Sequence, residues 1–358
     1  MNLDEQLATR QLVVFLGTGG VGKTTIAAAS ALQASRTRRT LVLTIDPARR
    51  LADSLGVKLG SEVVNVRPNL DALMLDTKAA LDALIRRYAT TPETLSRILR
   101  SRFYEQLSDA FAGSEEFVAM GTLHDLVVDG NYETIVVDTP PSRHAIEFLR
   151  VNRKLIRVYE SGVVKYLFRP TRFLRLGGGY MANVLARWTS SEYVEEFAEF
   201  MTTFDQMFAD MEGRVRTMDR VLTDPARTAL NVVATAEEES VPQTTRLYED
   251  VTRGLGLPIR SCVVNRFYPP LETEDVPEAF ADPARVAAAT DATVEDAGRF
   301  VADARAATAF YRVLAADHRR YGAQLQAALP LPFRFVPAQA GSVHDLDGLE
   351  RVRRSLFG

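Results

Sequence analysis

The stretch FLGTGGVGKTT, residues 15–25, constrains the fold more than any other part of the chain. It follows an apolar, β-branched run, fits the pattern G-x-x-x-x-G-K-[ST], and leads into the alanine-rich stretch TTIAAASALQASR. Glycines let the backbone curl so that successive N–H groups point at phosphate oxygens, helped by the N-terminus of the following helix. Because a strand before the loop and a helix after it are the context that this chemistry needs, the segment predicts a nucleotide phosphate site.

Short apolar runs alternate with helix-patterned stretches along the chain, as expected of a parallel sheet that helices cover on both faces. We therefore predict an α/β fold of the P-loop NTPase type, with a doubly wound, mainly parallel sheet. The predicted strands are residues 11–17, 40–46, 72–76, 132–139, 229–236, 260–266 and 333–337.

Two helix-patterned intervals are too long to be ordinary crossovers between neighbouring strands. They are residues 78–115 and 150–223, and we predict that these insertions form a helical subdomain. The P-loop ATPase domain would then be discontinuous and comprise residues 1–77, 116–149 and 224–358. The P-loop pattern occurs once, so we expect one nucleotide site in the chain.

The charge, the cysteine content and the hydropathy of the chain argue against several classes of function. The net charge is −3 over 358 residues, which argues against nucleic acid as a partner because such proteins need a strongly basic face. A single cysteine, Cys262, leaves no intramolecular disulfide and no Cys-x-x-Cys metal site. The N-terminus is polar and acidic, and no apolar run approaches the roughly 20 residues that span a bilayer. We therefore expect a cytoplasmic protein.

The residue types around the phosphate loop indicate a catalytic arrangement. Lys23 would reach the β- and γ-phosphates of ATP, and the Thr24 hydroxyl would bind Mg²⁺. Asp138 ends the apolar run YETIVVD and suits a carboxylate that holds Mg²⁺ through water. Asp46 ends another run, TLVLTID, although a strand-end aspartate is equally often only a helix N-cap.

Three segments together resemble the P-loop, switch I and switch II of the arsenite-pump ATPase family, which includes ATPases that guide tail-anchored membrane proteins. They are GTGGVGKTT, LTIDPARRLADSLG and VVDTPPSRHAIEFL, and VVNRF (263–267) and FRFVPAQAGSVHDLDGL (333–349) extend the likeness. The resemblance implies an ATPase that uses ATP and Mg²⁺ and works as a dimer. It also implies that Asp46 positions the attacking water.

The resemblance assigns binding roles residue by residue. Thr24, Asp46 and Asp138 would serve the metal. Lys23 and Asp46 would be catalytic, Asn265 would meet the adenine edge, and Pro337 would lie against the base. Arg49 is a further catalytic candidate. The residues expected to hold the nucleotide are Gly17, Thr18, Gly19, Gly20, Val21, Gly22, Lys23, Thr24, Thr25, Asn265, Arg266 and Pro337.

The chain also departs from the family pattern at positions that bear on the dimer contact and on metal binding. Thr18 stands where relatives carry a lysine that reaches across the dimer to the partner's nucleotide. Because a neutral hydroxyl cannot replace a cation near developing phosphate charge, we predict that Arg49, or alternatively Arg143, supplies that charge, either within the chain or from the partner. Absence of Cys-x-x-Cys disfavours a zinc or arsenite site, so no zinc is expected.

The second insertion carries an apolar stripe at helical spacing. Its flexible methionines and aromatic rings suit a groove for a hydrophobic client helix, but packing against other inserted helices is the usual reason for such a stripe, and one helix can do both. The basic stretch 150–175 suits transient contact with an anionic membrane or is a solvated face. The stripe comprises Val194, Phe197, Met201, Phe204, Phe208, Met211, Val215 and Met218.

Taken together, these features predict an ATP-hydrolysing molecular switch that controls a helical subdomain handling a hydrophobic client, as in membrane-protein targeting. It would act as a homodimer or as a heterodimer with a paralogue. One alternative is a regulatory or positioning ATPase of the MinD and ParA type, in which two large helical insertions are unexpected. Another is a nucleotide-binding scaffold with little turnover, against which Lys23, Thr24, Asp46 and Asp138 argue.

Overall fold

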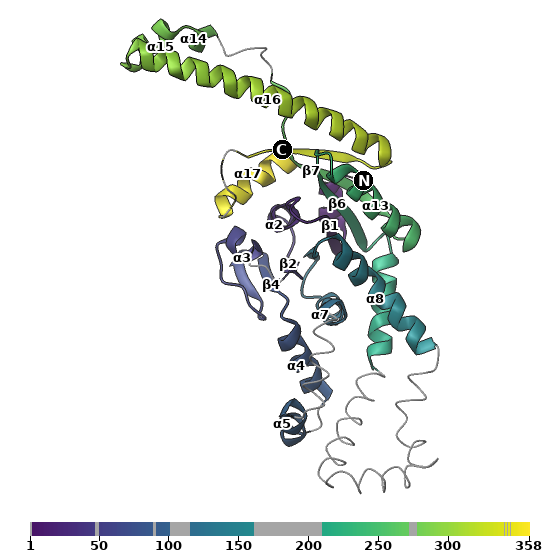
Figure 1. Cartoon of the computed structure of the whole chain (residues 1–358). Coiled ribbons are helices and arrows are strands. Elements are labelled where there is room, and N and C mark those ends of the chain that lie inside the picture. Colours follow the sequence, from purple (N-terminus) through teal and green to yellow (C-terminus); the bar gives the residue numbers. More distant parts are fainter. Residues whose placement is uncertain are drawn as a thin grey trace, which may run out of the picture.

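The computed structural model of the chain describes residues 2–46, 50–88, 91–100, 115–160, 210–271, 278–339, 341, 343 and 345–358. Within these residues an eight-stranded sheet runs in the order β3-β4-β2-β5-β1-β6-β7-β8 (Figure 1). The strands are β1 (Leu12–Gly17), β2 (Thr40–Thr44), β3 (Val64–Arg67), β4 (Leu70–Met74), β5 (Thr134–Asp138), β6 (Thr228–Thr235), β7 (Ile259–Phe267) and β8 (Phe333–Pro337).

All neighbouring strands pair in parallel except β3, which is antiparallel to β4. The fold is therefore the predicted α/β arrangement with a doubly wound, mostly parallel sheet. Every predicted strand is present, and β3 is an additional one at the edge of the sheet. Its residues are half-buried or exposed, so its sequence lacks the continuous apolar run that marks the central strands.

Helices cover both faces of the sheet. One face is packed by α1 (Leu3–Thr9), α2 (Lys23–Ala34), α3 (Arg50–Leu55) and α17 (Leu346–Phe357). The other is packed by α7 (Glu115–Val128), α8 (Ser142–Glu160), the helix 210–223 and α13 (Ser240–Glu249). A π-helical segment, η2 (Asp250–Gly254), continues α13.

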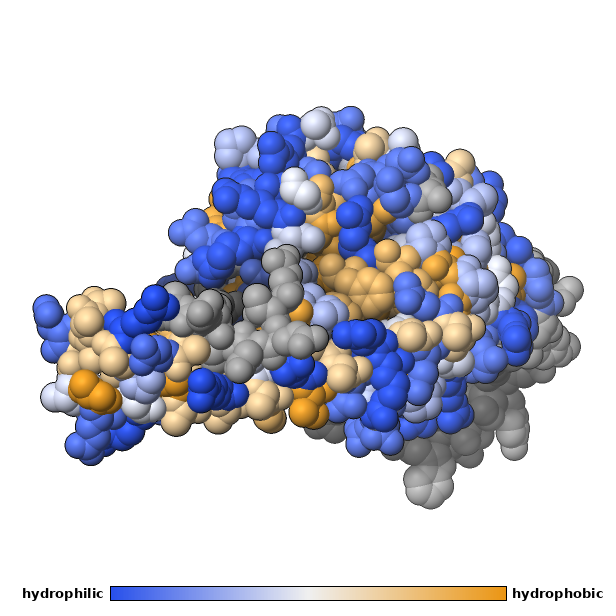
Figure 2. Space-filling model, turned by 90° about the horizontal axis from the view of Figure 1, so that it is seen from above, coloured by the Kyte–Doolittle hydropathy of each residue, from blue (hydrophilic) through white to orange (hydrophobic). Residues whose placement is uncertain are grey.

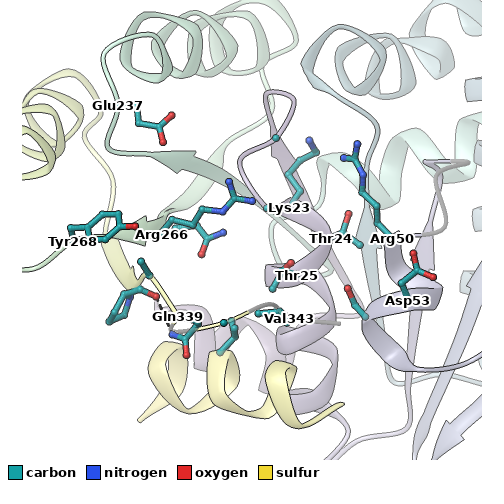
Figure 3. A pocket seen from close by; sticks show the side chains of 18 of the residues that line it. Lys23, Thr24, Thr25, Arg50, Asp53, Glu237, Arg266, Tyr268, Gln339 and Val343 are labelled. Carbon is teal, nitrogen blue, oxygen red and sulfur yellow. Dashed lines mark hydrogen bonds between the residues drawn. The ribbon is translucent and has the colours of Figure 1, made fainter. Parts of the chain in front are cut away.

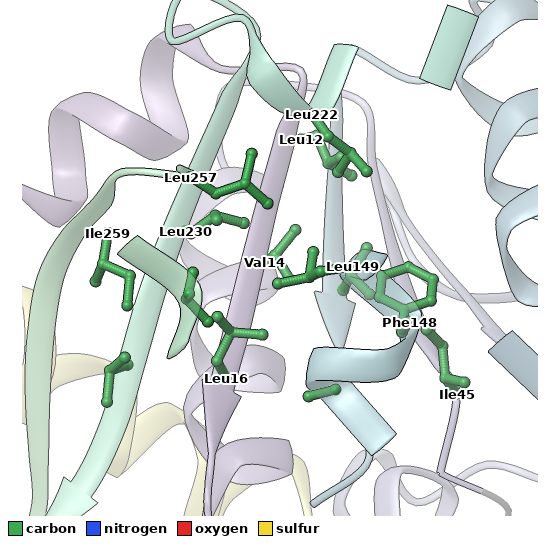
Figure 4. Close-up of a cluster of buried hydrophobic side chains, with 14 of the residues drawn as sticks. Leu12, Val14, Leu16, Ile45, Phe148, Leu149, Leu222, Leu230, Leu257 and Ile259 are labelled. Atoms are coloured by element: carbon green, nitrogen blue, oxygen red, sulfur yellow. The ribbon is translucent and has the colours of Figure 1, made fainter. Parts of the chain in front are cut away.

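The central strand β1 supplies both apolar cores because its side chains alternate between the faces. Val13 and Phe15 belong to the core with α2, and their neighbours in β1 point the other way. Figure 4 shows that second core, where Phe148 and Leu149 of α8 approach β1. All of these side chains are fully or almost fully buried, so the C-terminal end of β1 is held firmly from both sides. That end carries the phosphate loop.

Beyond the sheet, the described parts of the two predicted insertions are helical. They contain α4 (Thr77–Tyr88), α5 (Pro92–Arg100), the greater part of α8 and the helix 210–223 (Figure 1). Met211, Val215 and Met218 of the apolar stripe are buried, so this end of the stripe packs as core. The stripe residues from Val194 to Phe208 lie outside the described residues, and the boundaries of the helical subdomain remain a prediction.

A third long connection, between β7 and β8, is not evident in the sequence pattern. It contains α14 (Glu278–Ala281), α15 (Pro283–Thr290) and the 35-residue helix α16 (Val294–Ala328). Figure 1 shows α16 crossing the top of the molecule and extending well beyond the sheet, with α14 and α15 at its far end. Among the described helices, none is long and apolar enough to cross a membrane.

Candidate nucleotide site

The phosphate loop joins β1 to α2 at the C-terminal edge of the sheet. Gly17 is the last residue of β1 and Lys23 the first of α2. Gly20 and Gly22 have φ angles of 81° and 86°, in the left-handed region that favours glycine. A Cβ on Gly22 would also lie only 2.2 Å from Nδ2 of Asn265. Both the curl of the loop and its close approach to β7 therefore require glycine at position 22.

Lys23 is held inside the loop that it follows. Its Nζ donates a hydrogen bond to the carbonyl oxygen of Thr18 at 2.8 Å. Burial lowers the pKa of Lys23, while the nearby carboxylates of Asp138 and Asp46 raise it. The Thr18 side chain is buried, so this position contributes its backbone carbonyl to Lys23.

Asp138 lies at the C-terminal end of β5, in register with Phe15 of β1 and Thr44 of β2. Its side chain is fully buried, and its Oδ2 accepts a hydrogen bond from the Thr44 hydroxyl at 3.0 Å. Burial raises the pKa of Asp138 to about 6, although hydrogen bonding from Thr24 and the charge of Lys23 oppose that rise.

The donor set around Asp138 fits a magnesium ion. Asp138 Oδ1 is buried without a hydrogen-bond partner, and the Thr24 hydroxyl lies within hydrogen-bonding reach of this carboxylate. Mg²⁺ is a hard cation that keeps several of its water ligands when it binds to a protein. One hydroxyl as a direct ligand and one carboxylate that contacts the bound waters match this preference. Thr24 and Asp138 would thus hold Mg²⁺ together with phosphate oxygens. Among the described residues, no group of three or more His, Cys, Asp or Glu side chains could hold a metal without a nucleotide.

Asp46 follows β2 at the same edge of the sheet. Its backbone N–H donates to the Thr44 hydroxyl at 3.3 Å, the same hydroxyl that donates to Asp138. The side chain lines the cavity next to the phosphate loop. The structure therefore brings Asp46, Asp138 and Lys23 together, as the sequence predicts. Arg49 lies outside the described residues.

A cavity of about 700 Å³ extends from the phosphate loop to β7 and β8 (Figure 3). Of the predicted residues, it brings together Gly20, Gly22, Lys23, Thr24, Thr25, Asp46, Asn265, Arg266 and Pro337. Gly17, Thr18, Gly19 and Val21 shape the loop without lining the cavity, and Asp138 lies beneath it.

The far end of the cavity provides a flat polar and aromatic environment for a base. Asn265 donates from Nδ2 to the Val21 carbonyl at 3.0 Å, which ties β7 to the phosphate loop. Arg266 has a φ angle of 53°, a conformation that non-glycine residues rarely adopt and that is often found at functional sites. Tyr268 and Gln339 line the same end and are additional to the predicted set.

Arg50 is a further cavity residue that the motif pattern does not predict. It is the first residue of α3, and Figure 3 shows its guanidinium beside the Lys23 ammonium group. No hydrogen bond or ion pair joins it to another residue in the described part of the chain. Two neighbouring cations at the phosphate end of the cavity suit a polyphosphate. In the sequence, the only indication that Arg50 contacts phosphate is its position four residues after Asp46.

Arg143, the alternative candidate for the missing cation, is not brought to the cavity. It lies in the first turn of α8, its side chain is exposed, and it does not line the cavity. Instead, its charge contributes to lowering the pKa of Glu147, behind the larger effects of the Lys154 hydrogen bond. Arg143 therefore does not reach the cavity of its own chain in this structure, and its role at the phosphates stays a prediction.

Comparison with known proteins supports this interpretation of the cavity. Residues 10–288 match the model of a family described as anion-transporting ATPases. The ATPase GET3 of Malassezia globosa is 28% identical over 261 residues, which cover 71% of this chain and 72% of that protein. The ATPase get3 of Schizosaccharomyces japonicus is 26% identical over 257 residues, covering 70% and 72%. A Chlorobaculum tepidum protein that carries the name of an arsenical pump-driving ATPase is 27% identical over 243 residues, covering 66% and 56%.

Proposed function

The chain belongs to the family of anion-transporting ATPases and is an ATPase, and we propose that its nucleotide cycle controls the binding of a hydrophobic client. One observation carries the proposal. Asp138, beneath the phosphate loop, is followed after three residues by α8, whose 19 residues run from the sheet toward the inserted helices. A change at the γ-phosphate therefore reaches the insertion through one continuous piece of backbone.

At the phosphate end, each residue has a distinct role in the proposed cycle. Lys23 and Arg50 bind the β- and γ-phosphate oxygens, and Asp46 orients the attacking water. Thr24 and Asp138 would hold Mg²⁺, which would supply positive charge to the phosphate oxygens. All of these groups come from one chain. Asn265 and Arg266 bind the adenine edge, and Pro337 packs against the base.

Residues 139–141 and the first turns of α8 connect this chemistry to the insertion. Thr139 donates from its hydroxyl to the Phe15 carbonyl at 2.8 Å, and Phe148 is fully buried beneath the sheet. Packed interiors shift between discrete arrangements rather than deforming continuously. A displacement of residues 139–141 on ATP binding would therefore move α8 as a rigid element and, with it, the inserted helices.

The names of the relatives suggest two kinds of cargo, a membrane-protein segment or an arsenical compound. Soft As(III) prefers thiolate ligands. The single cysteine, Cys262, is buried in β7, where burial raises its pKa to about 12. This argues against an arsenical site built from this chain, so we favour a hydrophobic client, such as a tail-anchored membrane protein. We further propose that the protein acts in the cytoplasm as a homodimer or a paralogue heterodimer that contacts membranes transiently.

Site-specific photo-crosslinking tests the client proposal. A photoreactive residue at Phe204, in the predicted stripe, should capture an apolar helix in one nucleotide state and release it in the other. A probe at the exposed Val63, which lies outside the two predicted insertions, serves as the control. Loss of the nucleotide dependence in Lys23→Ala would support the switch. Failure to capture any apolar helix in the ATP, ADP and nucleotide-free states would mean that the stripe is core.

A further inference from the structure

The connection between β7 and β8 forms a projecting arm, which we define as residues 278–320. Figure 2, which looks down on the molecule, shows the arm extending to the left of the body. The tip of the arm has a small apolar core of its own, formed by Val286, Ala287, Ala297 and Val301. At the other end, α16 packs against β7 and α13, next to the adenine end of the nucleotide cavity, where Asn265 and Pro337 lie.

His318 of α16 connects the arm to the cavity through Tyr268. Tyr268 follows β7 directly and lines the adenine end of the cavity. Its backbone N–H donates a hydrogen bond to Nδ1 of His318 at 3.3 Å. The two rings also meet edge to face, with their centroids 5.0 Å apart and their planes inclined by 86°. Because His318 is only 6% exposed, little water competes for this contact, and one arm residue holds both the backbone and the ring of Tyr268.

A second arm residue, Tyr311, supports the Tyr268 ring. The two ring centroids are 5.5 Å apart, with the planes inclined by 77°, and such edge-to-face pairs are favourable. The Tyr311 hydroxyl donates to the Pro269 carbonyl at 3.0 Å, away from the ring contact. Figure 3 shows the Tyr268 side chain at the adenine end of the cavity, with Lys23 and Arg50 toward the other end. The arm therefore fixes an aromatic ring at the place where a base would lie.

We propose that Tyr268 contacts the adenine ring of bound ATP and that His318 of the arm positions it for this contact. The inference rests on the proposed function, in which ATP occupies the cavity. An aromatic side chain that stacks with a base adds affinity at the base without changing the contacts to the phosphates. Among the described residues that line the cavity, His318 is not present, so it acts through Tyr268 as a positioning residue.

The contact depends on the protonation state of His318. Nδ1 accepts a hydrogen bond only when it carries no proton, so the Tyr268 contact needs the neutral ring. Burial lowers the pKa of His318, whereas the charges of Glu237, in the loop after β6, and Asp317, its neighbour on α16, raise it. The ring of Phe267, which lies 6.0 Å away on β7, carries no charge. Because the pKa is lowered overall, the contact is intact at pH 7 and is lost only as pH falls below the ordinary value of 6.5.

A ligand without a base separates the adenine contact from the phosphate contacts. Calorimetric titration of the full chain with Mg²⁺ would compare ATP with inorganic tripolyphosphate. Tyr268→Ala should weaken ATP binding about tenfold and leave tripolyphosphate binding within about twofold, whereas Tyr268→Phe should retain both. An unchanged ratio of the two affinities in Tyr268→Ala would overturn the inference while leaving the ATPase intact. A wild-type chain that binds neither ligand would overturn both the inference and the nucleotide site.

Conservative variants test the positioning role of His318. His318→Ala should lower the ratio of ATP to tripolyphosphate affinity roughly threefold to tenfold at pH 7.5. His318→Asn should retain the ratio, because the amide oxygen takes the place of Nδ1 and accepts the same hydrogen bond. Tyr311→Phe is the matched control, since it removes the other hydrogen bond between α16 and the residues after β7 but keeps the ring. Equal effects of His318→Ala and Tyr311→Phe would mean that attachment of the arm matters and His318 does not.

The pH profile of the same ratio tests the role of the neutral ring. In the wild type the ratio should be constant above pH 6.5 and fall between pH 6.5 and 5, whereas in His318→Asn it should stay constant. Asp138, with a pKa of about 6, and the phosphates titrate in this range too, but they affect both ligands alike and cancel in the ratio. A constant ratio in the wild type, or an equal fall in His318→Asn, would contradict the inference. Neither result depends on the identity of the client.

Discussion

Replacement of Asp138 by asparagine should stabilise the nucleotide-free protein while abolishing its activity. The carboxylate is fully buried, its pKa is raised from 3.8 to about 6 mainly by burial, and its Oδ1 has no hydrogen-bond partner. An amide keeps the oxygen that accepts from Thr44 and puts its nitrogen where the unpaired oxygen was. The substitution therefore removes a buried negative charge and keeps the hydrogen bond from Thr44.

The size of the expected gain in stability, and its dependence on pH, follow from the raised pKa of Asp138. A carboxyl group whose pKa is higher in the folded state binds its proton more tightly there, so its ionisation opposes folding as pH rises. The penalty is absent below the unfolded value of 3.8, grows between 3.8 and about 6, and is constant above that range. A shift of roughly two pKa units corresponds to about 3 kcal/mol. Because Lys23 loses a nearby anion in the variant, we expect a gain of about 1–3 kcal/mol in unfolding free energy at pH 7.5.

Denaturant unfolding of the nucleotide-free chain measures this difference directly. Asp138→Asn should be more stable than wild type at pH 7.5 and should approach it as pH falls toward 4. Asp53→Asn is the control, because Asp53 also lines the cavity but is exposed. With ATP and Mg²⁺ the order should reverse, since only the wild type gains stability from the bound nucleotide. Destabilisation of Asp138→Asn by more than about 1 kcal/mol at pH 7.5 would refute the reasoning.

Two further substitutions probe the phosphate end. Arg50→Ala should lower kcat about 100-fold with a smaller change in ATP affinity, and Arg50→Lys should recover part of the loss, as steady-state ATPase assays would measure. Arg143→Ala is the matched control and should retain turnover. Loss of turnover in Arg143→Ala but not in Arg50→Ala would show that Arg143, and not Arg50, supplies the cation at the phosphates. Gly22→Ala should abolish ATP binding in calorimetric titration and destabilise the chain by about 1–3 kcal/mol, because its Cβ would collide with Asn265. Wild-type affinity in that variant would contradict the loop geometry.

The sequence predicts the central sheet well because parallel strands that are buried on both faces consist of continuous apolar runs. It does not reveal β3, whose four residues are only half-buried at an edge. It also does not reveal the arm. The packing of α16 changes along its length, from the sheet at Gly322 to the small core at Val301, so no single helical face carries a uniform apolar pattern.

At the nucleotide site, the residues with a fixed place in the P-loop motif were predictable, because their backbone geometry determines their chemistry. Lys23, Thr24 and Asp138 take the places expected of them. Arg50 was not predictable, because its position depends on how α3 is oriented after β2 and no spacing rule encodes that orientation. Arg49 is still a prediction, since it lies outside the described residues.

Turnover of ATP by wild type and by Asp46→Asn tests the central claim most directly. Asp46 lines the cavity beside Lys23 and follows the strand whose Thr44 contacts Asp138. If its carboxylate orients the attacking water, the amide variant should bind ATP with unchanged affinity and hydrolyse it about 100-fold more slowly in single-turnover experiments with Mg²⁺. An Asp46→Asn variant that hydrolyses ATP as fast as wild type would contradict the proposed mechanism.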